Sequence, residues 1–156
     1  MDIKGRVAIV TGGAVRLGRV LVLELARRGA RLVIHYHSSA SPALEVITQI
    51  KGMGGEAIAI QADLRQTAEA QSLITRTAEH FGQLDILVNS AAIFKPGDWA
   101  GTTEANWDEH MAINLKAPFF LSRRLPRTWA GSDLHTSLTL PTGEPPAPPP
   151  ITWPTR

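Results

Sequence analysis

Cysteine is absent from this sequence of 156 residues, and aromatic residues make up only 6% of it, with Tyr36 as the single tyrosine. Without cysteine there can be no disulfide, no thiolate metal site and no cysteine nucleophile, and we expect no metal site. Apolar runs are too short to span a membrane, and the one that follows the polar start, residues 1–6, is too short for a secretory signal. We therefore expect a cytoplasmic protein with no membrane contact.

The sequence also lacks runs of like charge. The 16 lysines and arginines nearly balance the 14 aspartates and glutamates, and never more than two basic residues are adjacent. A nucleic-acid site needs basic residues gathered on one face, so we expect no nucleic-acid partner. A single anionic ligand remains compatible with the net charge of +2.

Short apolar runs alternate with amphipathic segments along most of the chain. Continuous apolar runs are typical of strands buried on both faces, and apolar residues on one arc are typical of helices. Ser41 before Pro42 predicts a helix start, and Gly29 predicts a helix end. The predicted strands are residues 7–10, 32–34, 57–60 and 84–88. The predicted helices are residues 17–28, 41–50, 67–81 and 106–121.

This alternation predicts an α/β fold with a doubly wound parallel sheet, because parallel strands need crossover connections and helices supply them. We expect three layers and the strand order 3-2-1-4, with residues 84–88 as an exposed apolar edge. The predicted domain is residues 1–121. Residues 122–156 read as a disordered or polyproline tail, because prolines recur from Pro126 to Pro154.

A glycine-rich turn follows the first predicted strand. It runs Thr11-Gly12-Gly13, then Arg16-Leu17-Gly18 at the start of the first helix. Backbone N–H groups and the helix dipole favour a pyrophosphate at such a place. Arg16 stands where the usual pattern has its middle glycine, and taken alone the turn is equally compatible with a purely structural role.

The second strand ends without an acid. Its end reads His37-Ser38-Ser39, so no carboxylate is available to accept hydrogen bonds from an adenosine ribose diol. Arg16 could instead make a charge-assisted fork to a 2′-phosphate. The sequence therefore favours NADPH over NADH. His35 and His37 alternate across the strand, so only one of them can face this cofactor.

These motifs resemble the short-chain dehydrogenases/reductases, and within them the pteridine reductases, whose glycine turn likewise runs Arg-Leu-Gly. Over residues 1–121 the similarity also includes His35-Tyr36-His37, Asp63, Asn89-Ser90-Ala91-Ala92, and Asn114-Leu115. The resemblance implies a Rossmann-type fold, truncated at about four strands. It also implies an NADPH-dependent reductase, in its full-length form, of a pterin or a related carbonyl substrate.

The resemblance assigns roles to several residues. Asp63 would contact the adenine, residues 89–92 would line the nicotinamide ribose, and Asn114 would support a water relay as the remnant of the catalytic set. Phe94 would stack on a pterin, and His37 would face the cofactor. The cofactor-binding residues expected in all are Thr11, Gly12, Gly13, Arg16, Leu17, Gly18, His37, Ser38, Ser39, Asp63, Leu64, Asn89, Ser90 and Ala91.

Structural alternatives stand beside these roles. Asp63 could cap a helix or turn, Phe94 could pack on the core, and Asn114 could bond the backbone of its helix. His35 could be packed or solvated. Trp99 and Trp107 are most simply core or interface aromatics.

The family's catalytic pair, Tyr-x-x-x-Lys, is missing from these 156 residues. Ala40 stands four residues after Tyr36, and no lysine follows Lys116. General acid catalysis contributes roughly a hundred- to ten-thousand-fold, so we expect NADPH binding without turnover. A frameshift near Ser122 is one hypothesis for the loss, because a shifted frame is compatible with an acid near position 142 and a tyrosine near position 155.

Other readings of the function stay open. One is a fragment of a 3-oxoacyl carrier-protein reductase, and another is a non-catalytic nucleotide-binding protein. A third is an interaction module in which residues 145–150 are a polyproline ligand for an aromatic groove. The resemblance also allows a homo-oligomer.

Overall fold

The computed structural model describes residues 2–95 and 97–125. The predicted tail from position 126 onward, with the positions of the frameshift hypothesis near 142 and 155 and the polyproline segment, lies outside the described residues. The elements are β1 (Val7–Val10), α1 (Arg16–Arg27), β2 (Arg31–Tyr36), α2 (Ala40–Gly52), β3 (Ala57–Gln61), α3 (Thr67–Phe81), β4 (Ile86–Val88), α4 (Glu104–Met111), the π-helix η1 (Ala112–Lys116) and α5 (Ala117–Arg124).

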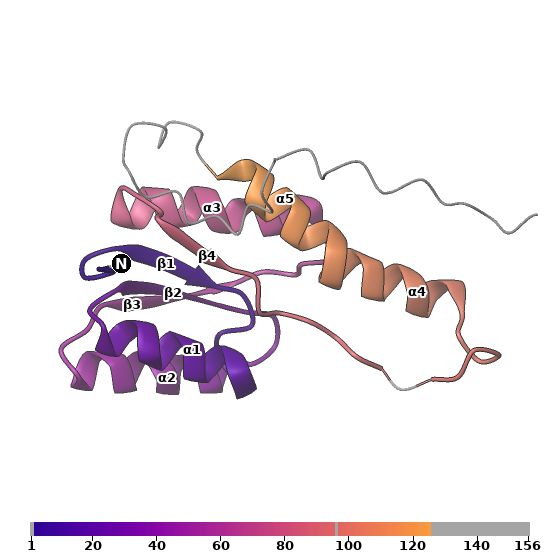
Figure 1. Cartoon of the computed structure of the whole chain (residues 1–156), viewed down its shortest axis with the longest axis horizontal. Helices are drawn as coiled ribbons and strands as arrows, with labels where there is room; N and C mark the ends of the chain where they lie inside the picture. Colours follow the sequence, from indigo (N-terminus) through magenta and orange to yellow (C-terminus); the bar gives the residue numbers. More distant parts are fainter. Residues whose placement is uncertain (1, 96, 126–156) are drawn as a thin grey trace, which may run out of the picture.

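The sheet has the predicted topology. Its four parallel strands lie in the order β3-β2-β1-β4, with Ile9 paired to Val33 on one side and to Leu87 on the other. Helices α1 and α2 cover one face, and α3 and α5 cover the other (Figure 1). The prediction of a three-layer, doubly wound α/β fold is confirmed.

The core divides at the sheet because successive side chains of a strand point to opposite faces. Val7 and Ile9 of β1 pack with residues of α3 and α5, whereas Ala8 and Val10 pack with residues of α1 and α2. All four are fully buried. This burial on both faces explains why β1 is a continuous apolar run, and it fixes the strand ends from which the site is built.

Most predicted boundaries differ from the structure by one or two residues, and the starts of α2 and β4 are the two that matter for the prediction of contacts. Helix α2 begins at Ala40 after Ser39, not at Ser41, and the Ser39 side chain makes no capping hydrogen bond. Leu84 precedes β4 and is buried outside the strand. Asp85, the residue just before β4, links this segment to β1: its carboxylate accepts hydrogen bonds from the Val7 N–H and from the Arg6 guanidinium.

The single helix predicted at residues 106–121 is a run of three segments that continues to Arg124. Pro118 explains the break, because proline has no N–H for the i→i−4 ladder. Just before it, the Ala117 N–H bonds to the carbonyl of Ala112, five residues back. One π-helical turn therefore separates α4 from α5.

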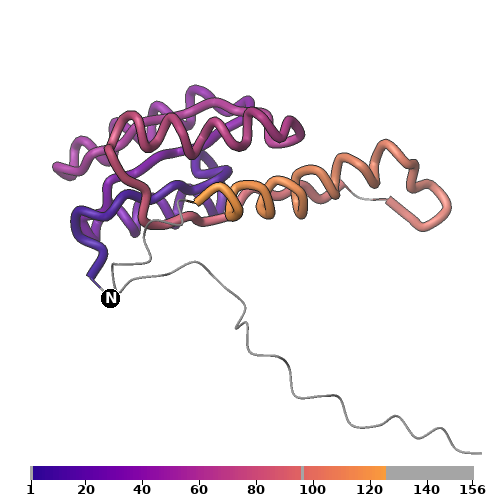
Figure 2. Tube along the Cα trace, turned by 90° about the horizontal axis from the view of Figure 1, so that it is seen from above, coloured from indigo at the N-terminus to yellow at the C-terminus, as the bar shows by residue number. Residues whose placement is uncertain are grey.

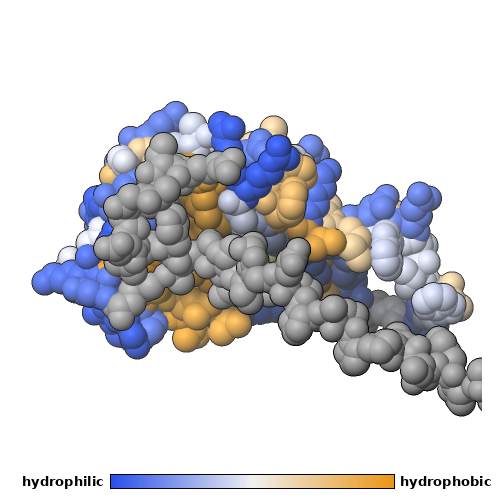
Figure 3. Space-filling model, turned by 45° about the horizontal axis from the view of Figure 1, so that its top comes forward, coloured by the Kyte–Doolittle hydropathy of each residue, from blue (hydrophilic) through white to orange (hydrophobic). Residues whose placement is uncertain are grey.

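This helical run projects beyond the sheet (Figure 2). Trp107, Leu115 and Phe119 on it are exposed, and so is Trp99 before it. Of the two expectations for Trp99 and Trp107, core or interface, the core is therefore wrong, and an interface stays a prediction. Figure 3 shows apolar residues at the surface on the side that carries α3, α5 and β4. No helix within residues 2–95 and 97–125 is long and apolar enough to cross a membrane.

Candidate functional site

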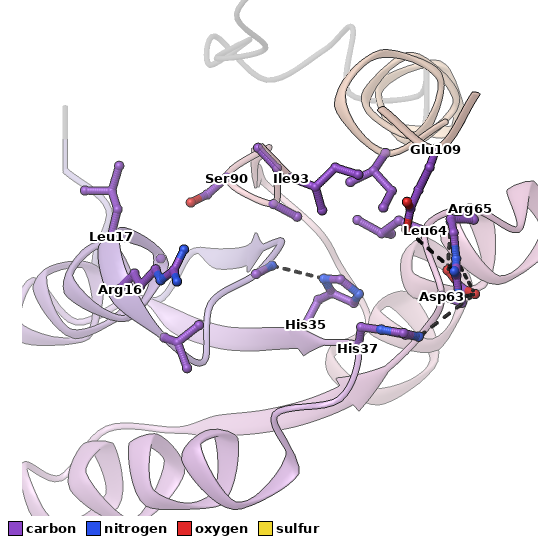
Figure 4. Close-up of a pocket in the computed structure, with 16 residues that line it drawn as sticks. Arg16, Leu17, His35, His37, Asp63, Leu64, Arg65, Ser90, Ile93 and Glu109 are labelled. Carbon is purple, nitrogen blue, oxygen red and sulfur yellow. Dashed lines mark hydrogen bonds and ion pairs between the residues drawn. The ribbon is translucent and has the colours of Figure 1, made fainter. Parts of the chain in front are cut away.

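A cavity of about 610 Å³ opens beside the carboxyl ends of β1, β2 and β3, the edge at which open parallel sheets bind ligands (Figure 4). Its volume lies within the range of roughly 300–1,000 Å³ typical of small-molecule sites. Its lining comes from the glycine turn, the end of β2, the loops after β3 and β4, and α4 with η1. The lining residues are Gly12, Val15, Arg16, Leu17, Gly18, His35, His37, Asp63, Leu64, Arg65, Ser90, Ala91, Ala92, Ile93, Glu109 and Ile113.

The glycines of the turn are required by close backbone approach. A Cβ on Gly18 would lie 2.1 Å from the Gly12 carbonyl oxygen, and a Cβ on Gly12 would lie 3.1 Å from the Cα of Ala91. Gly12 also has a φ of 65°, which glycine adopts freely. Leu17 and Gly18 lie in the first turn of α1, where backbone N–H groups have no partner within the helix. This arrangement fits a bound pyrophosphate.

Arg16 has a backbone conformation that glycine adopts freely, at the place where the usual pattern has its middle glycine. Its φ is 50°, and no other non-glycine residue in the described part of the chain has a positive φ. The left-handed region costs an L-residue on the order of 1–2 kcal/mol. Arg16 lines the cavity, so the turn accepts this strain and gains a cation beside the ligand space.

His35 is buried and bonds to two neighbouring loops. Its Nδ1 accepts the Gly12 N–H at 3.0 Å, and its Nε2 lies 3.1 Å from the Ala62 carbonyl oxygen. Burial lowers the pKa of the imidazole, although the Ala62 carbonyl acts in the opposite direction. Of the two sequence alternatives, the packed one is therefore right, and the ring also lines the cavity.

His37, two residues further on, is half exposed, with its Nε2 3.9 Å from a carboxylate oxygen of Asp63. Arg65 makes a fork to Asp63, with nitrogen–oxygen distances of 2.7 and 2.9 Å. The Arg65 guanidinium holds the pKa of Asp63 below its ordinary value. Asp63 still has lone pairs for a ligand donor, because each carboxylate oxygen accepts more than one hydrogen bond.

Glu109 of α4 closes one side of the cavity. It pairs with Lys95 and lies 3.8 Å from Arg65, so a chain of charges joins the loop after β3 to α4. Lys95 is the main cause of the lowered pKa of Glu109. Arg65 and Glu109 were not predicted from the sequence to lie in this site, because nothing in the local pattern indicates that these distant residues meet.

Thr11 does not line the cavity. It is buried, and its hydroxyl oxygen accepts the N–H groups of Ser90 and Ala91 at 2.9 and 3.0 Å. The backbone N–H of Gly13 is likewise used, by the His35 carbonyl at 3.0 Å. Thr11 and Gly13 thus hold the walls of the site together.

Asn114 and Phe94 differ from their expected surroundings. The Asn114 side chain accepts the Ile93 N–H and donates to the Ile93 carbonyl, both at 2.9 Å, so it holds the loop after β4 and not its own helix. Phe94 is 91% exposed, which rules out packing on the core, and it does not line the cavity.

The structure therefore brings most of the predicted residues to one place. Those that line the cavity are Gly12, Arg16, Leu17, Gly18, His37, Asp63, Leu64, Ser90 and Ala91. Those that do not line it are Thr11, Gly13, Ser38, Ser39, Asn89, Phe94 and Asn114. Val15, Ile93 and Ile113 are further lining residues that sequence reasoning missed, and as apolar residues in an amphipathic pattern they carry no signal of a site.

Comparison with known proteins identifies relatives of this site and fold. The model of the short chain dehydrogenase family matches residues 6–133. The chain is 40% identical over 124 residues to the hydroxynaphthalene reductase-like protein Arp2 of Metarhizium anisopliae, covering 78% of this chain and 46% of that relative. The chain thus spans about half the length of the curated relatives that it matches.

Two solved structures contain a nicotinamide cofactor. A short chain dehydrogenase from Burkholderia cenocepacia in complex with NADP has a TM-score of 0.77 and 37% identity, covering 80% of this chain and 51% of that one. A blue fluorescent protein from a metagenomic library, in complex with NADPH, has a TM-score of 0.76 and 32% identity over the same shares. With the sequence match and the fold in agreement, the chain belongs to the short-chain dehydrogenase/reductase family of oxidoreductases.

Proposed function

We propose that the cavity binds NADPH and that the chain is the cofactor-binding part of an NADPH-dependent reductase. The observation that carries this proposal is Arg16, which places a cation in the glycine turn in the same cavity as His37. No carboxylate stands at residues 37–39 to favour a free ribose diol. The NADP and NADPH in the two solved relatives support the same choice.

Different residues of the site are assigned to different parts of the cofactor. In this proposal the N–H groups of Leu17 and Gly18 hold the pyrophosphate, and Arg16 and His37, with Ser38 and Ser39 nearby, hold the 2′-phosphate. NADPH supplies a hydride when it is bound. The chain's own residues bind and orient it.

The adenine and the nicotinamide ribose, at opposite ends of the cofactor, are assigned to the loops after β3 and β4. Asp63 and Leu64 contact the adenine, and Asn89, Ser90 and Ala91 lie along the nicotinamide ribose. Asn114 supports the site through the loop that it holds, and Phe94 contacts the substrate. In this proposal residues 1–121 form the nucleotide-binding domain.

We further propose that this chain alone does not turn over substrate, because its 156 residues contain no Tyr-x-x-x-Lys pair. For a full-length reductase the proposed substrate is a pterin or a related carbonyl compound. The name of the Metarhizium relative adds hydroxynaphthalene-type compounds to the candidates. A 3-oxoacyl carrier-protein substrate and a non-catalytic nucleotide-binding role are the alternatives.

Calorimetric titration of the purified chain with NADPH and with NADH tests the proposal, and dihydrobiopterin and a hydroxynaphthalene are offered as substrates in the same samples. We expect NADPH to bind more tightly than NADH, with no turnover. Absence of binding would refute the cofactor assignment, and turnover would refute the claim of inactivity.

Two proposals concern the tail. Sequencing of the coding DNA tests the frameshift near Ser122, and stop codons throughout the shifted frame would exclude it. A synthetic peptide of residues 141–156 tests the interaction reading, which fails if the peptide binds no SH3 or WW domain.

A further inference from the structure

We infer that His35 is a positioning residue for the nucleotide site: its neutral imidazole fixes the glycine turn in the binding shape, and its protonation releases the turn and weakens nucleotide binding. The inference rests on the proposed function, since it concerns the nucleotide bound there. In this inference His35 acts on nucleotide binding through the glycine turn, without itself contacting the phosphate.

The backbone N–H groups of Gly12 and Gly13 both bond to this one residue of β2. The Gly12 N–H donates to the His35 Nδ1 at 3.0 Å, and the Gly13 N–H donates to the His35 carbonyl oxygen at 3.0 Å. On the other side of the ring, Nε2 reaches the Ala62 carbonyl in the loop after β3 at 3.1 Å. Figure 4 shows the bond from the turn to the His35 ring. With the Ala62 contact, the imidazole joins the turn to the loop that carries Asp63.

This contact pattern defines the tautomer. The Gly12 N–H can only donate, so Nδ1 must carry a lone pair, and the Ala62 carbonyl can only accept, so Nε2 must carry the proton. Protonation of Nδ1 would set two N–H donors against each other in a ring that is 2% exposed. The Gly12 N–H would then lose its acceptor inside the protein, where an unmatched donor is costly.

The charges around the ring do not favour its protonation. Arg16 from the turn, His37 from the end of β2, and Arg65 from the loop after β3 line the same cavity and carry or can carry positive charge. The acids there are already paired, Asp63 with Arg65 and Glu109 with Lys95. Within the described residues neither acid hydrogen-bonds to His35. Burial further lowers the pKa of His35 below its ordinary value of 6.5.

The pH dependence of His35 has the same sign for both nucleotides. Protonation of His35 disturbs the pyrophosphate turn, which NADH and NADPH share, so both should bind more weakly as the pH falls to the pKa of His35, which burial holds below its ordinary value of 6.5. NADH has no 2′-phosphate, so charges beside that group do not act on its binding. NADH is therefore the cleaner probe of His35.

The test has a first arm without nucleotide. Nitrogen chemical shifts of the histidine side chains, measured by NMR on the whole chain at about pH 7.5, report the tautomer of His35. We expect a lone pair on Nδ1 and a proton on Nε2. The opposite tautomer, or a charged ring at this pH, would overturn the inference whether or not a nucleotide binds.

The second arm measures NADH and NADPH affinity at about pH 5.5 and 7.5 in the wild type, His35→Asn and His35→Leu. The Asn Oδ1 can replace Nδ1 as acceptor and does not titrate, so H35N should keep the wild-type affinity at the higher pH and lose the pH dependence for NADH. H35L should bind about tenfold more weakly at both pH values, as expected when the Gly12 N–H of the turn loses its acceptor. His80→Asn, an exposed position in the last turn of α3, is the matched control and should retain the wild-type profile.

The outcomes are distinct. If H35N keeps the wild-type pH dependence for NADH, His35 is not the group responsible and the inference fails, and this result does not depend on H35L folding. If the wild type binds neither nucleotide at either pH, the proposed function fails and so does the binding half of the inference. The expected tautomer in the first arm would in that case support only the structural half.

Discussion

The hydroxyl oxygen of Thr11 lies 2.9 Å from the amide nitrogen of Ser90, and the same oxygen accepts the N–H of Ala91 at 3.0 Å. Thr11 follows β1, and Ser90 follows β4, the neighbouring strand. The link therefore fixes two walls of the cavity that are far apart in sequence. It does so without any contact to the space that a ligand would fill.

Thr11→Val should destabilise the fold by about 1 kcal/mol, because valine has the same shape but removes the hydroxyl that accepts the partly buried N–H groups of Ser90 and Ala91. The Ser90 N–H keeps the Val88 carbonyl as a second acceptor, so the larger loss falls on Ala91. Urea unfolding followed by circular dichroism measures this change. Thr11→Ser is the matched control and should recover most of the loss, since it keeps the hydroxyl. Equal stability of T11V and the wild type would mean that water replaces the threonine.

Arg16→Gly should have separate effects on stability, through the backbone strain at this position, and on the preference for NADPH over NADH. Glycine tolerates the φ of 50°, so the free energy of unfolding should stay the same or rise, by about 1 kcal/mol at most. The loss of a charged donor should weaken NADPH binding about 10- to 100-fold and leave NADH binding nearly unchanged. Calorimetry with both nucleotides measures the two effects.

Arg19→Gln is the control for that experiment. Arg19 lies in the same helix but pairs with Glu45 of α2 and does not line the cavity. R19Q removes the same charge as R16G, but outside the cavity. The NADPH preference of R19Q should therefore equal that of the wild type. If R19Q lowers NADPH affinity as much as R16G does, general charge is responsible and not the position of Arg16.

Asp63 should make stability depend on pH in the acid range. Arg65 lowers the pKa of this carboxyl from its ordinary 3.8, so the folded state favours the charged form. That contribution is fully present above the unfolded pKa and is lost as the pH falls through 3.8 to the lower folded value. Urea unfolding of the wild type and Asp63→Asn should differ at pH values above about 5 and converge in strong acid.

Asn114→Ala should loosen the loop after β4. The variant removes both hydrogen bonds to Ile93, so the Ile93 amide should exchange its hydrogen faster than in the wild type, with a loss of stability of about 1 kcal/mol. Hydrogen-exchange NMR measures the first effect and urea unfolding the second. Unchanged exchange at Ile93 would show that the loop is held by other contacts, such as Lys95 with Glu109.

Strand β4 should drive self-association. In the described part of the chain it pairs only with β1, so its outer edge presents free backbone groups beside apolar side chains. Sedimentation velocity should show species that grow with concentration, and amide protection at residues 86–88 should rise with them. Phe119→Ser, which changes an exposed residue of α5, should leave this association unchanged. A monodisperse monomer that melts cooperatively would contradict the prediction.

Local sequence determined the elements and their order. Continuous apolar runs such as Val7–Val10 report burial on both faces of a parallel sheet, and that requirement acts on each residue separately. Gly29 has a φ of 81° just beyond α1, as a glycine that ends a helix should. The glycine turn and the missing acid at residues 37–39 were likewise visible in the sequence, because backbone approach and charge constrain them position by position.

Contacts between distant residues were decided by the tertiary structure alone. His35 lies beside Gly12 because β2 pairs with β1, and Glu109 reaches Arg65 because a helical run containing a π-turn lies across the carboxyl edge of the sheet. Hydrogen bonds and ion pairs depend on distance in space, and a linear sequence does not give that distance. The sequence thus determined which chemical groups are available, while the fold decided that His35 supports the turn and that Asn114 holds Ile93.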